Sequence, residues 1–193
     1  MDAVSHKTKA AAAIGAQLVT AVESVIGQAP SLIALHEPEF TGREWEYVKD
    51  CLDTGWVSSV GSYVDRIEVM LGELMQAKAV ACVNGTAALH LCYQLAGIAA
   101  GYEVLVPSLT FVATVNPIHY IGAIPHFIDS SPVTLGVDAD VLADYLGEIA
   151  ELRNGYCFNR ATNRPISALV VRHIFGPAGD MGGLVEVAAR WYI

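Results

Sequence analysis

Charge is scarce in this 193-residue sequence, since Asp, Glu, Lys and Arg together make up 16% of it. The balance is acidic, with a formal net charge of −9, and no run of basic residues occurs. These two features argue against nucleic acid as a main partner. Apolar residues make up 53% of the sequence, which fits a sheet buried on both faces and surface hidden in an oligomer.

Long unbroken apolar runs are also lacking. The uncharged stretches 79–102 and 104–128 contain turn residues at Asn84-Gly85 and Asn116-Pro117, so their apolar parts are too short to span a bilayer. Residues 7–22 faintly resemble a signal peptide, but their apolar part is mostly alanine and is interrupted by polar residues, which favours a short amphipathic helix. We therefore expect a cytoplasmic protein without a membrane segment.

Recognisable metal and nucleotide motifs are absent. The four cysteines (Cys51, Cys82, Cys92 and Cys157) form no C-x-x-C pair, and no two histidines share a convincing ligand spacing. We expect reduced thiols and no metal site. The patterns GxGxxG, P-loop, HExxH and GxSxG do not occur either.

Apolar segments of strand length alternate with segments of helical periodicity, which predicts an α/β fold built from parallel βαβ units. Strands are expected at Ala79–Val83, Glu103–Pro107, Ile124–Ile128 and Ser167–Ile174, with another beginning at Trp191. Helices are expected over 1–31, from a capping box at Thr41 and Glu44 to Gly55, and at Tyr63–Leu74, Val115–Ile121, Asp138–Ala150 and Met181–Arg190, with a small hairpin within Arg153–Asn163.

The last residues predict a strand that is only starting, so we expect the front portion of a larger domain. The expected division is a helical extension over 1–31 and an incomplete α/β domain over 32–193.

The turn Asn84-Gly85-Thr86 joins the first expected strand to a helix. The first N–H groups of that helix lack intrahelical partners and would point to the ligand-binding edge of the sheet, where a phosphate fits. The same local pattern also fits an ordinary turn in which Asn84 or Thr86 only caps the helix.

Two further places are candidates for ligand contact. The loop Gly55–Gly61 carries Ser58 and Ser59 between two helices, and it either contacts substrate or is a plain connector. His173 lies near the carboxyl end of the fourth expected strand, where ligands gather in open α/β sheets. His90 and His126 lie within apolar elements and are expected to be structural.

Five segments in order and spacing resemble the DegT/DnrJ/EryC1/StrS sugar aminotransferases, and the resemblance covers about residues 32–190. Within that family, the chain looks most similar to the branch acting on UDP-linked 4-keto-6-deoxy sugars in legionaminic acid-type pathways, partly because of the insertion at Arg153-Asn154-Gly155. The five segments are Leu35–Pro38, Thr54–Gly61, Val83–His90, Pro107–Thr114 and His173–Gly176.

The resemblance implies a truncated large domain of the aspartate aminotransferase-like fold (fold type I), with a mostly parallel sheet and flanking helices. It implies pyridoxal 5'-phosphate (PLP) as cofactor, with Asn84, Gly85 and Thr86 at its phosphate, Phe111 against its ring, and His173 nearby. Ser58 and Ser59 are implied substrate contacts. A homodimer is implied as well, because two subunits build each active site in this family.

The implied reaction moves an amino group, usually from glutamate, to the keto carbon of a nucleotide sugar used in surface polysaccharide or nonulosonic acid biosynthesis. It needs a lysine on the cofactor and a carboxylate on the pyridine nitrogen. The family segments that carry them would follow Trp191, and Lys49 and Lys78 are not substitutes by position, so we expect little or no turnover from these 193 residues. The alternatives are a non-catalytic remnant that dimerises or binds a phosphate-bearing ligand, and a related PLP-dependent sugar dehydratase.

Overall fold

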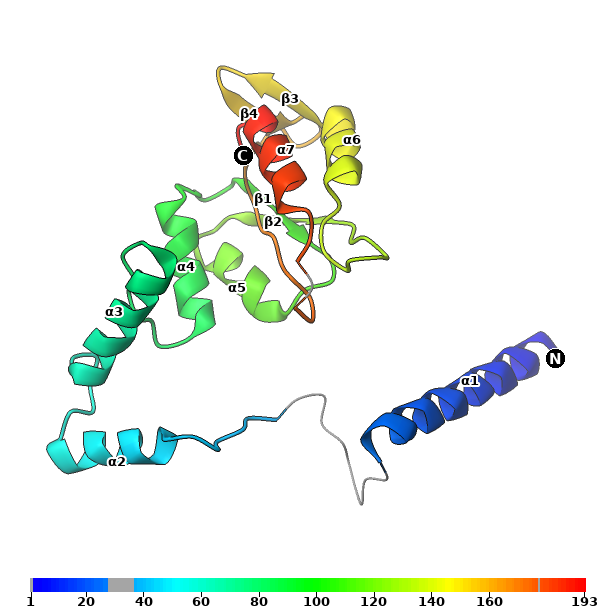
Figure 1. Ribbon diagram of the computed structural model, residues 1–193. Helices are drawn as coiled ribbons and strands as arrows, with labels where there is room; N and C mark the ends of the chain where they lie inside the picture. Colours follow the sequence, from blue (N-terminus) through cyan, green and yellow to red (C-terminus); the bar gives the residue numbers. More distant parts are fainter. Residues whose placement is uncertain (1, 28–36, 177) are drawn as a thin grey trace. The chain divides into compact units, whose positions relative to one another are not determined.

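A computed structural model describes residues 2–27, 37–176 and 178–193, which form two units, residues 1–62 and 63–193, treated separately below. Figure 1 labels the elements in chain order. The helices are α1 (Asp2–Ile26), α2 (Glu44–Thr54), α3 (Ser62–Met75), α4 (Gly85–Leu95), α5 (Val112–Tyr120), α6 (Ala139–Ile149) and α7 (Met181–Trp191). The strands are β1 (Glu103–Pro107), β2 (Ile124–Ile128), β3 (Ala150–Arg153), β4 (Tyr156–Asn159) and β5 (Pro165–Leu169).

The first unit contains the predicted helices α1 and α2. Helix α2 ends as expected at Gly55, whose left-handed backbone (φ 75°) accommodates the terminating turn. The predicted capping box is wrong: Arg43 occupies the N-cap position without a side-chain cap, and Glu44 accepts a hydrogen bond from the Gly42 amide instead. Residues 28–31 of the helix expected over 1–31 lie outside the described part of the chain.

The second unit is built on one mixed sheet with the strand order β2-β1-β5-β4-β3. Strands β2, β1 and β5 are parallel, whereas the hairpin β3–β4 adds to β5 in the antiparallel direction. Because β2 is an edge strand, Pro125 within it removes no hydrogen bond from a central ladder. The expectation of parallel βαβ units is therefore confirmed for three strands only.

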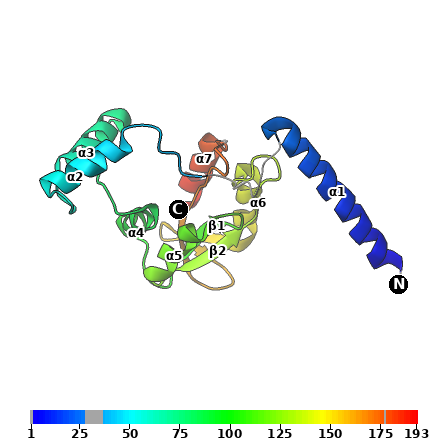
Figure 2. The same ribbon diagram turned by 90° about the horizontal axis from the view of Figure 1, so that it is seen from below.

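Helices cover both faces of this sheet (Figures 1 and 2). Strand β1 is fully buried, and its side chains alternate between the two faces. Leu105 packs with Leu142, Leu146 and Leu184 of α6 and α7, whereas Val104 and Val106 pack with Tyr93 and Ile118 of α4 and α5. These three layers hold the carboxyl ends of β1, β2 and β5 along one edge.

Polar side chains fix the starts of the helices in this unit. The Asn84 side chain caps α4, Asp138 caps α6 by accepting from the amides of Asp140 and Val141, and Asp180 caps α7 by accepting from Gly183.

Two element boundaries differ from the expected ones. Helix α5 starts three residues before its expected boundary, and the fourth strand ends at Leu169 rather than Ile174.

Two strand predictions are wrong. Ala79–Val83 forms no strand and pairs with none in the described residues, and Val80 and Val83 are 78% and 88% exposed. Trp191 ends helix α7 instead of starting a strand, and Tyr192 adopts a left-handed cap conformation. In both places the apolar sequence favours a strand, but a strand also needs a hydrogen-bonding neighbour.

Candidate functional site

The amino terminus of α4 is the first part of the candidate site. Asn84 Oδ1 accepts a hydrogen bond from the Ala87 amide at 2.9 Å, so the ordinary capping role of Asn84 is real. The amides of Gly85 and Thr86 have no acceptor among the residues that the structure describes. Two N–H groups at the positive end of the helix are thus available to an anion.

Open space lies in front of this helix terminus. A Cβ placed on Gly85 would meet no atom within 4 Å. A hollow of about 310 Å³ lies beside it, between residues 80–82 and α3. Its lining residues are Ile67, Glu68, Leu71, Val80, Ala81, Cys82, Asn84, Gly85 and Ala88. The Glu68 carboxylate accepts a hydrogen bond there from the Ala81 amide, at 2.8 Å.

Phe111 and His173 lie in the segments that follow β1 and β5. Phe111 occupies the N-cap position of α5, and its side chain is 64% exposed rather than packed in the core. His173 is also exposed, and its Nδ1 accepts a long hydrogen bond from the Gly179 amide at 3.4 Å. The fold therefore presents both rings to solvent at the carboxyl edge of the parallel strands. No hydrogen bond or ring contact joins either one to Asn84, Gly85 or Thr86 in the described residues.

The structure adds Arg172 to this edge, a residue that sequence reasoning missed. Its guanidinium Nη1 donates a hydrogen bond to Thr110 Oγ1 at 3.3 Å and so joins the segments after β5 and β1. A basic residue directly before His173, in a chain poor in positive charge, is the signal that could have revealed it.

Ser58 and Ser59 belong to the first unit and are described by their own surroundings. The Ser58 hydroxyl accepts a long hydrogen bond from the Val60 amide at 3.4 Å, as in a serine turn. Both residues are exposed, so their hydroxyls remain accessible. Their contact with substrate stays a prediction.

A buried polar network lies on the α6 face of the sheet. The Glu103 carboxylate accepts hydrogen bonds from His126 Nδ1 at 2.8 Å, from Asn159 at 2.9 Å and from the Thr162 hydroxyl. His126 Nε2 lies 2.8 Å from the Tyr145 hydroxyl. Burial alone would raise the pKa of Glu103, but these hydrogen bonds and the charge of His126 outweigh it and hold that pKa below its ordinary value.

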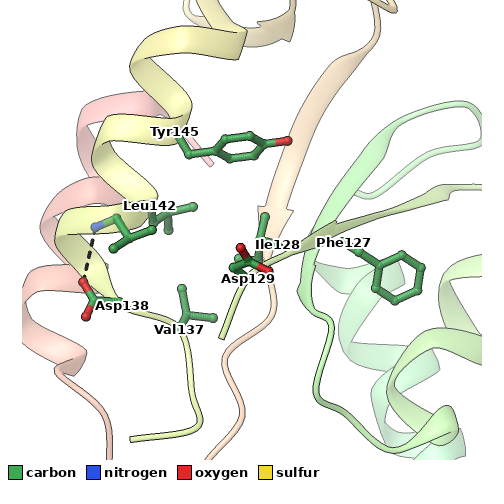
Figure 3. A pocket seen from close by; sticks show the side chains of 8 residues that line it. Phe127, Ile128, Asp129, Val137, Asp138, Leu142 and Tyr145 are labelled. Carbon is green, nitrogen blue, oxygen red and sulfur yellow. Dashed lines mark hydrogen bonds between the residues drawn. The ribbon is translucent and has the colours of Figure 1, made fainter. Parts of the chain in front are cut away.

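Tyr145 also lines a cavity of about 240 Å³ between β2 and α6, shown in Figure 3. Asp138, on its wall, is occupied as the cap of α6, and apolar residues form most of the lining. Burial raises the pKa of Tyr145, with nearby carboxylates including Glu103 adding to the effect, so the phenol stays protonated. The network and cavity thus have the character of a structural junction between the sheet and α6, as expected for His126.

Within the described ranges, no group of three or more His, Cys, Asp or Glu side chains is arranged to hold a metal ion. None of the helices described is both long and apolar enough to cross a membrane.

A family model for the DegT/DnrJ/EryC1/StrS aminotransferases matches residues 38–193. The chain belongs to this family. The match contains every candidate residue named above, and members of the family depend on PLP.

Curated relatives agree with the family assignment. The chain is 37% identical over 157 residues to the GDP-perosamine synthase of Vibrio cholerae, covering 81% of this chain and 38% of that protein. It is 40% identical over 156 residues to EpsN of Bacillus subtilis, whose name describes a pyridoxal phosphate-dependent aminotransferase; that match covers 80% and 38%. This DegT-family chain therefore spans about 38% of the length of these relatives.

The fold agrees as well. A DegT/DnrJ/EryC1/StrS aminotransferase from Brucella abortus superimposes with a TM-score of 0.65 at 26% identity, over 78% of this chain and 38% of that one. The expected fold class, a PLP-dependent aminotransferase fold with a sheet flanked by helices, is confirmed.

The residues present fit part of a PLP site. The open amides of Gly85 and Thr86, with free space before Gly85, suit a phosphate monoester. The exposed ring of Phe111 suits an aromatic partner.

Proposed function

We propose that this chain is part of an aminotransferase that moves an amino group from glutamate to the keto carbon of a nucleotide-linked 4-keto-6-deoxy sugar. The product would serve surface polysaccharide or nonulosonic acid biosynthesis in the cytoplasm. The observation that carries the proposal is the α4 terminus, where the amides of Gly85 and Thr86 lack acceptors among the described residues and Gly85 has open space beside it, within a PLP-family sequence.

Each candidate residue has a defined task in this proposal. The amides of Gly85 and Thr86 hold the cofactor phosphate, and the Thr86 hydroxyl adds a hydrogen bond, while Asn84 keeps the helix terminus in shape. Phe111 covers one face of the cofactor ring, and His173 lies at the same sheet edge. When bound, PLP supplies the electron sink of the reaction, and the protein supplies orientation and electrostatics.

The narrower proposal concerns the sugar. We assign it to the UDP-linked, legionaminic acid-type branch because of the insertion Arg153-Asn154-Gly155. Arg153 ends β3, and Asn154 and Gly155, both at positive φ, form the turn of the β3–β4 hairpin. Ser58 and Ser59 are the residues that we propose to contact the sugar substrate. A preference for GDP-linked over UDP-linked keto sugar would reject this branch while leaving the aminotransferase proposal intact.

A second candidate function is a non-catalytic one, and the surroundings of two lysines support it. Lys49 is paired with Asp53 on α2, and Lys78 is an exposed residue between α3 and α4. Neither has the environment of a cofactor-binding lysine. We therefore propose that residues 1–193 bind PLP without measurable turnover.

The proposed assembly is a homodimer. Its support is the amount of exposed apolar side chain, for example the stripe Ile14, Leu18, Val22 and Val25 along α1.

The test is equilibrium dialysis of PLP against the chain and two charge-matched variants. Gly85→Asp places a carboxylate where the phosphate would lie, and binding should weaken by about tenfold or more, which is about 1.4 kcal/mol. Gly147→Asp is the control, because Gly147 lies on the exposed side of α6 and also has free space around it. Equal PLP binding by all three proteins would refute the phosphate site.

Borohydride reduction then separates the two candidate functions. We expect no PLP fixed at a unique lysine, as judged by mass spectrometry of the reduced protein. A single labelled lysine, or glutamate-dependent amination of a keto sugar by these 193 residues, would contradict the non-catalytic expectation.

A further inference from the structure

Arg172 is the meeting point of three segments at the carboxyl edge of the sheet. Its guanidinium reaches Thr110, which follows β1. Its carbonyl oxygen lies so close to Gly136, in the segment after β2, that a Cβ there would be 3.2 Å from it. The segments that follow all three parallel strands therefore converge on one residue.

The Arg172 guanidinium has N–H donors that the hydrogen bond to Thr110 does not use. Arginine carries five N–H donors, and the hydrogen bond to Thr110 uses one of them. No salt bridge to Arg172 occurs among the described residues, although the side chain is half-buried and the chain carries net negative charge. A half-buried cation without an internal counter-ion favours an anion from outside.

The position suits a ligand. Open α/β sheets bind ligands outside the carboxyl ends of their parallel strands, and β1 and β5 are neighbours at this edge. The planar fork of arginine matches the two oxygens of a carboxylate or a phosphate, and the Thr110 hydroxyl that accepts from it is held beside the same place.

We propose that Arg172, with Thr110, forms an oxyanion-binding site separate from the phosphate site at Gly85 and Thr86. The identity of the ligand rests on the proposed function, which offers two sources: the carboxylate of the amino donor and the diphosphate of the nucleotide sugar. The site itself rests on the geometry around Arg172.

The experiment measures binding of two simple probes, inorganic pyrophosphate and glutarate, to the 193-residue chain by isothermal titration calorimetry. The buffer contains about 0.15 M salt to screen weak surface attraction. Arg172→Met should weaken binding of at least one probe by about tenfold or more, and Arg172→Lys should lie in between, because lysine keeps the charge but loses the fork.

Arg164→Met is the matched control. Arg164 also makes one 3.3 Å hydrogen bond from Nη1, to the Gly101 carbonyl, but it precedes β5 and so belongs to the opposite end of that strand. Its substitution should leave binding of both probes unchanged. Circular dichroism of each variant checks the fold, and Arg172→Lys keeps the test valid if Arg172→Met is unstable.

The outcomes identify the source. Loss of pyrophosphate binding alone indicates the nucleotide diphosphate, loss of glutarate binding alone indicates the amino donor, and loss of both supports a general oxyanion site. The proposal is overturned if neither probe binds, if Arg172→Met binds both as the unchanged chain does, or if Arg164→Met loses as much. PLP dialysis of Arg172→Met, expected to be normal, separates failure of this site from failure of the proposed function.

Discussion

Glu103 shows how one residue can link distant parts of the chain. It is 2% exposed, at the start of β1, and it receives hydrogen bonds from β2, from β4 and from the turn that follows β4. Such a carboxylate is stabilising only while it is ionised and all of its partners are in place.

The pH dependence of stability follows from this environment. A carboxyl group whose pKa is lowered on folding stabilises the protein above its ordinary pKa, and that contribution disappears as the pH falls through the folded value. We expect the urea midpoint to fall as the pH drops from 7 to below about 4.5. In Glu103→Gln the free energy of unfolding at neutral pH should be lower by about 1–3 kcal/mol. The urea midpoint of this variant should also depend less on acid.

Glu186→Gln is the control for this change, because Glu186 is exposed on α7. An unchanged stability in Glu103→Gln, or an equal loss in the control, would show that the network does not contribute as described.

Cys157 gives a second prediction at this scale. Burial, with a further contribution from the charge of Glu103, raises the pKa of its thiol to about 11, and the residue is 1% exposed. Since the thiolate is the reactive form, iodoacetamide should label the exposed Cys92 first and Cys157 last. Peptide mapping over time measures the order; early labelling of Cys157 would mean that β4 opens readily.

Single elements are fixed by their end residues. The carboxylates of Asp138 and Asp180 each satisfy amides in the first turn of their helix. Replacing either one by alanine should cost about 1 kcal/mol of unfolding free energy in urea denaturation. Asp144→Ala, on an exposed site within α6, is the control and should cost less. Equal losses in all three variants would argue against the caps.

Local signals of this kind explain what the sequence could predict. The turn-rich segment Arg153–Asn163 indicated a small hairpin, and the structure has one slightly earlier, with β3 starting at Ala150. Its turn residues Asn154 and Gly155 both adopt the positive φ that such a tight turn requires. The apolar segments Glu103–Pro107 and Ile124–Ile128 indicated strands, and β1 and β2 form at these residues. Strand β1 is buried throughout as expected, whereas β2, at the edge of the sheet, is mostly half-buried. The turn after Val83 was correctly placed at the start of α4, and the Asn84 cap proved real.

Other features depend on partners that local patterns do not specify. Ala79–Val83 has the composition of a strand, but no described strand pairs with it. Glu103 gave no local sign of its network, because its partners are 23, 56 and 59 residues away. Arg172 was overlooked for the same reason, since its meaning comes from Thr110, 62 residues earlier.

At the scale of the whole molecule, the apolar stripe of α1 bears on association. Leu18 lies in the middle of that stripe and is exposed. We expect sedimentation velocity to show the chain as a dimer or larger species whose proportion rises with concentration. Leu18→Glu should shift the distribution toward monomer if α1 takes part, whereas Gln17→Glu adds the same charge beside the stripe and should not. A monomer at every concentration would reject the proposed homodimer.

The pairing of β4 with β5 has a consequence for solubility. Strand β4 covers only Pro165 and Ile166, so Ala168 and Leu169 pair with β1 on one side and with no described strand on the other. An unpaired stretch of sheet edge of this kind can form hydrogen bonds with an extended segment of a second polypeptide. Mutual repulsion between chains carrying nine excess negative charges keeps such edges apart at neutral pH. Acidification toward the isoelectric point removes that repulsion, and turbidity should then grow with time.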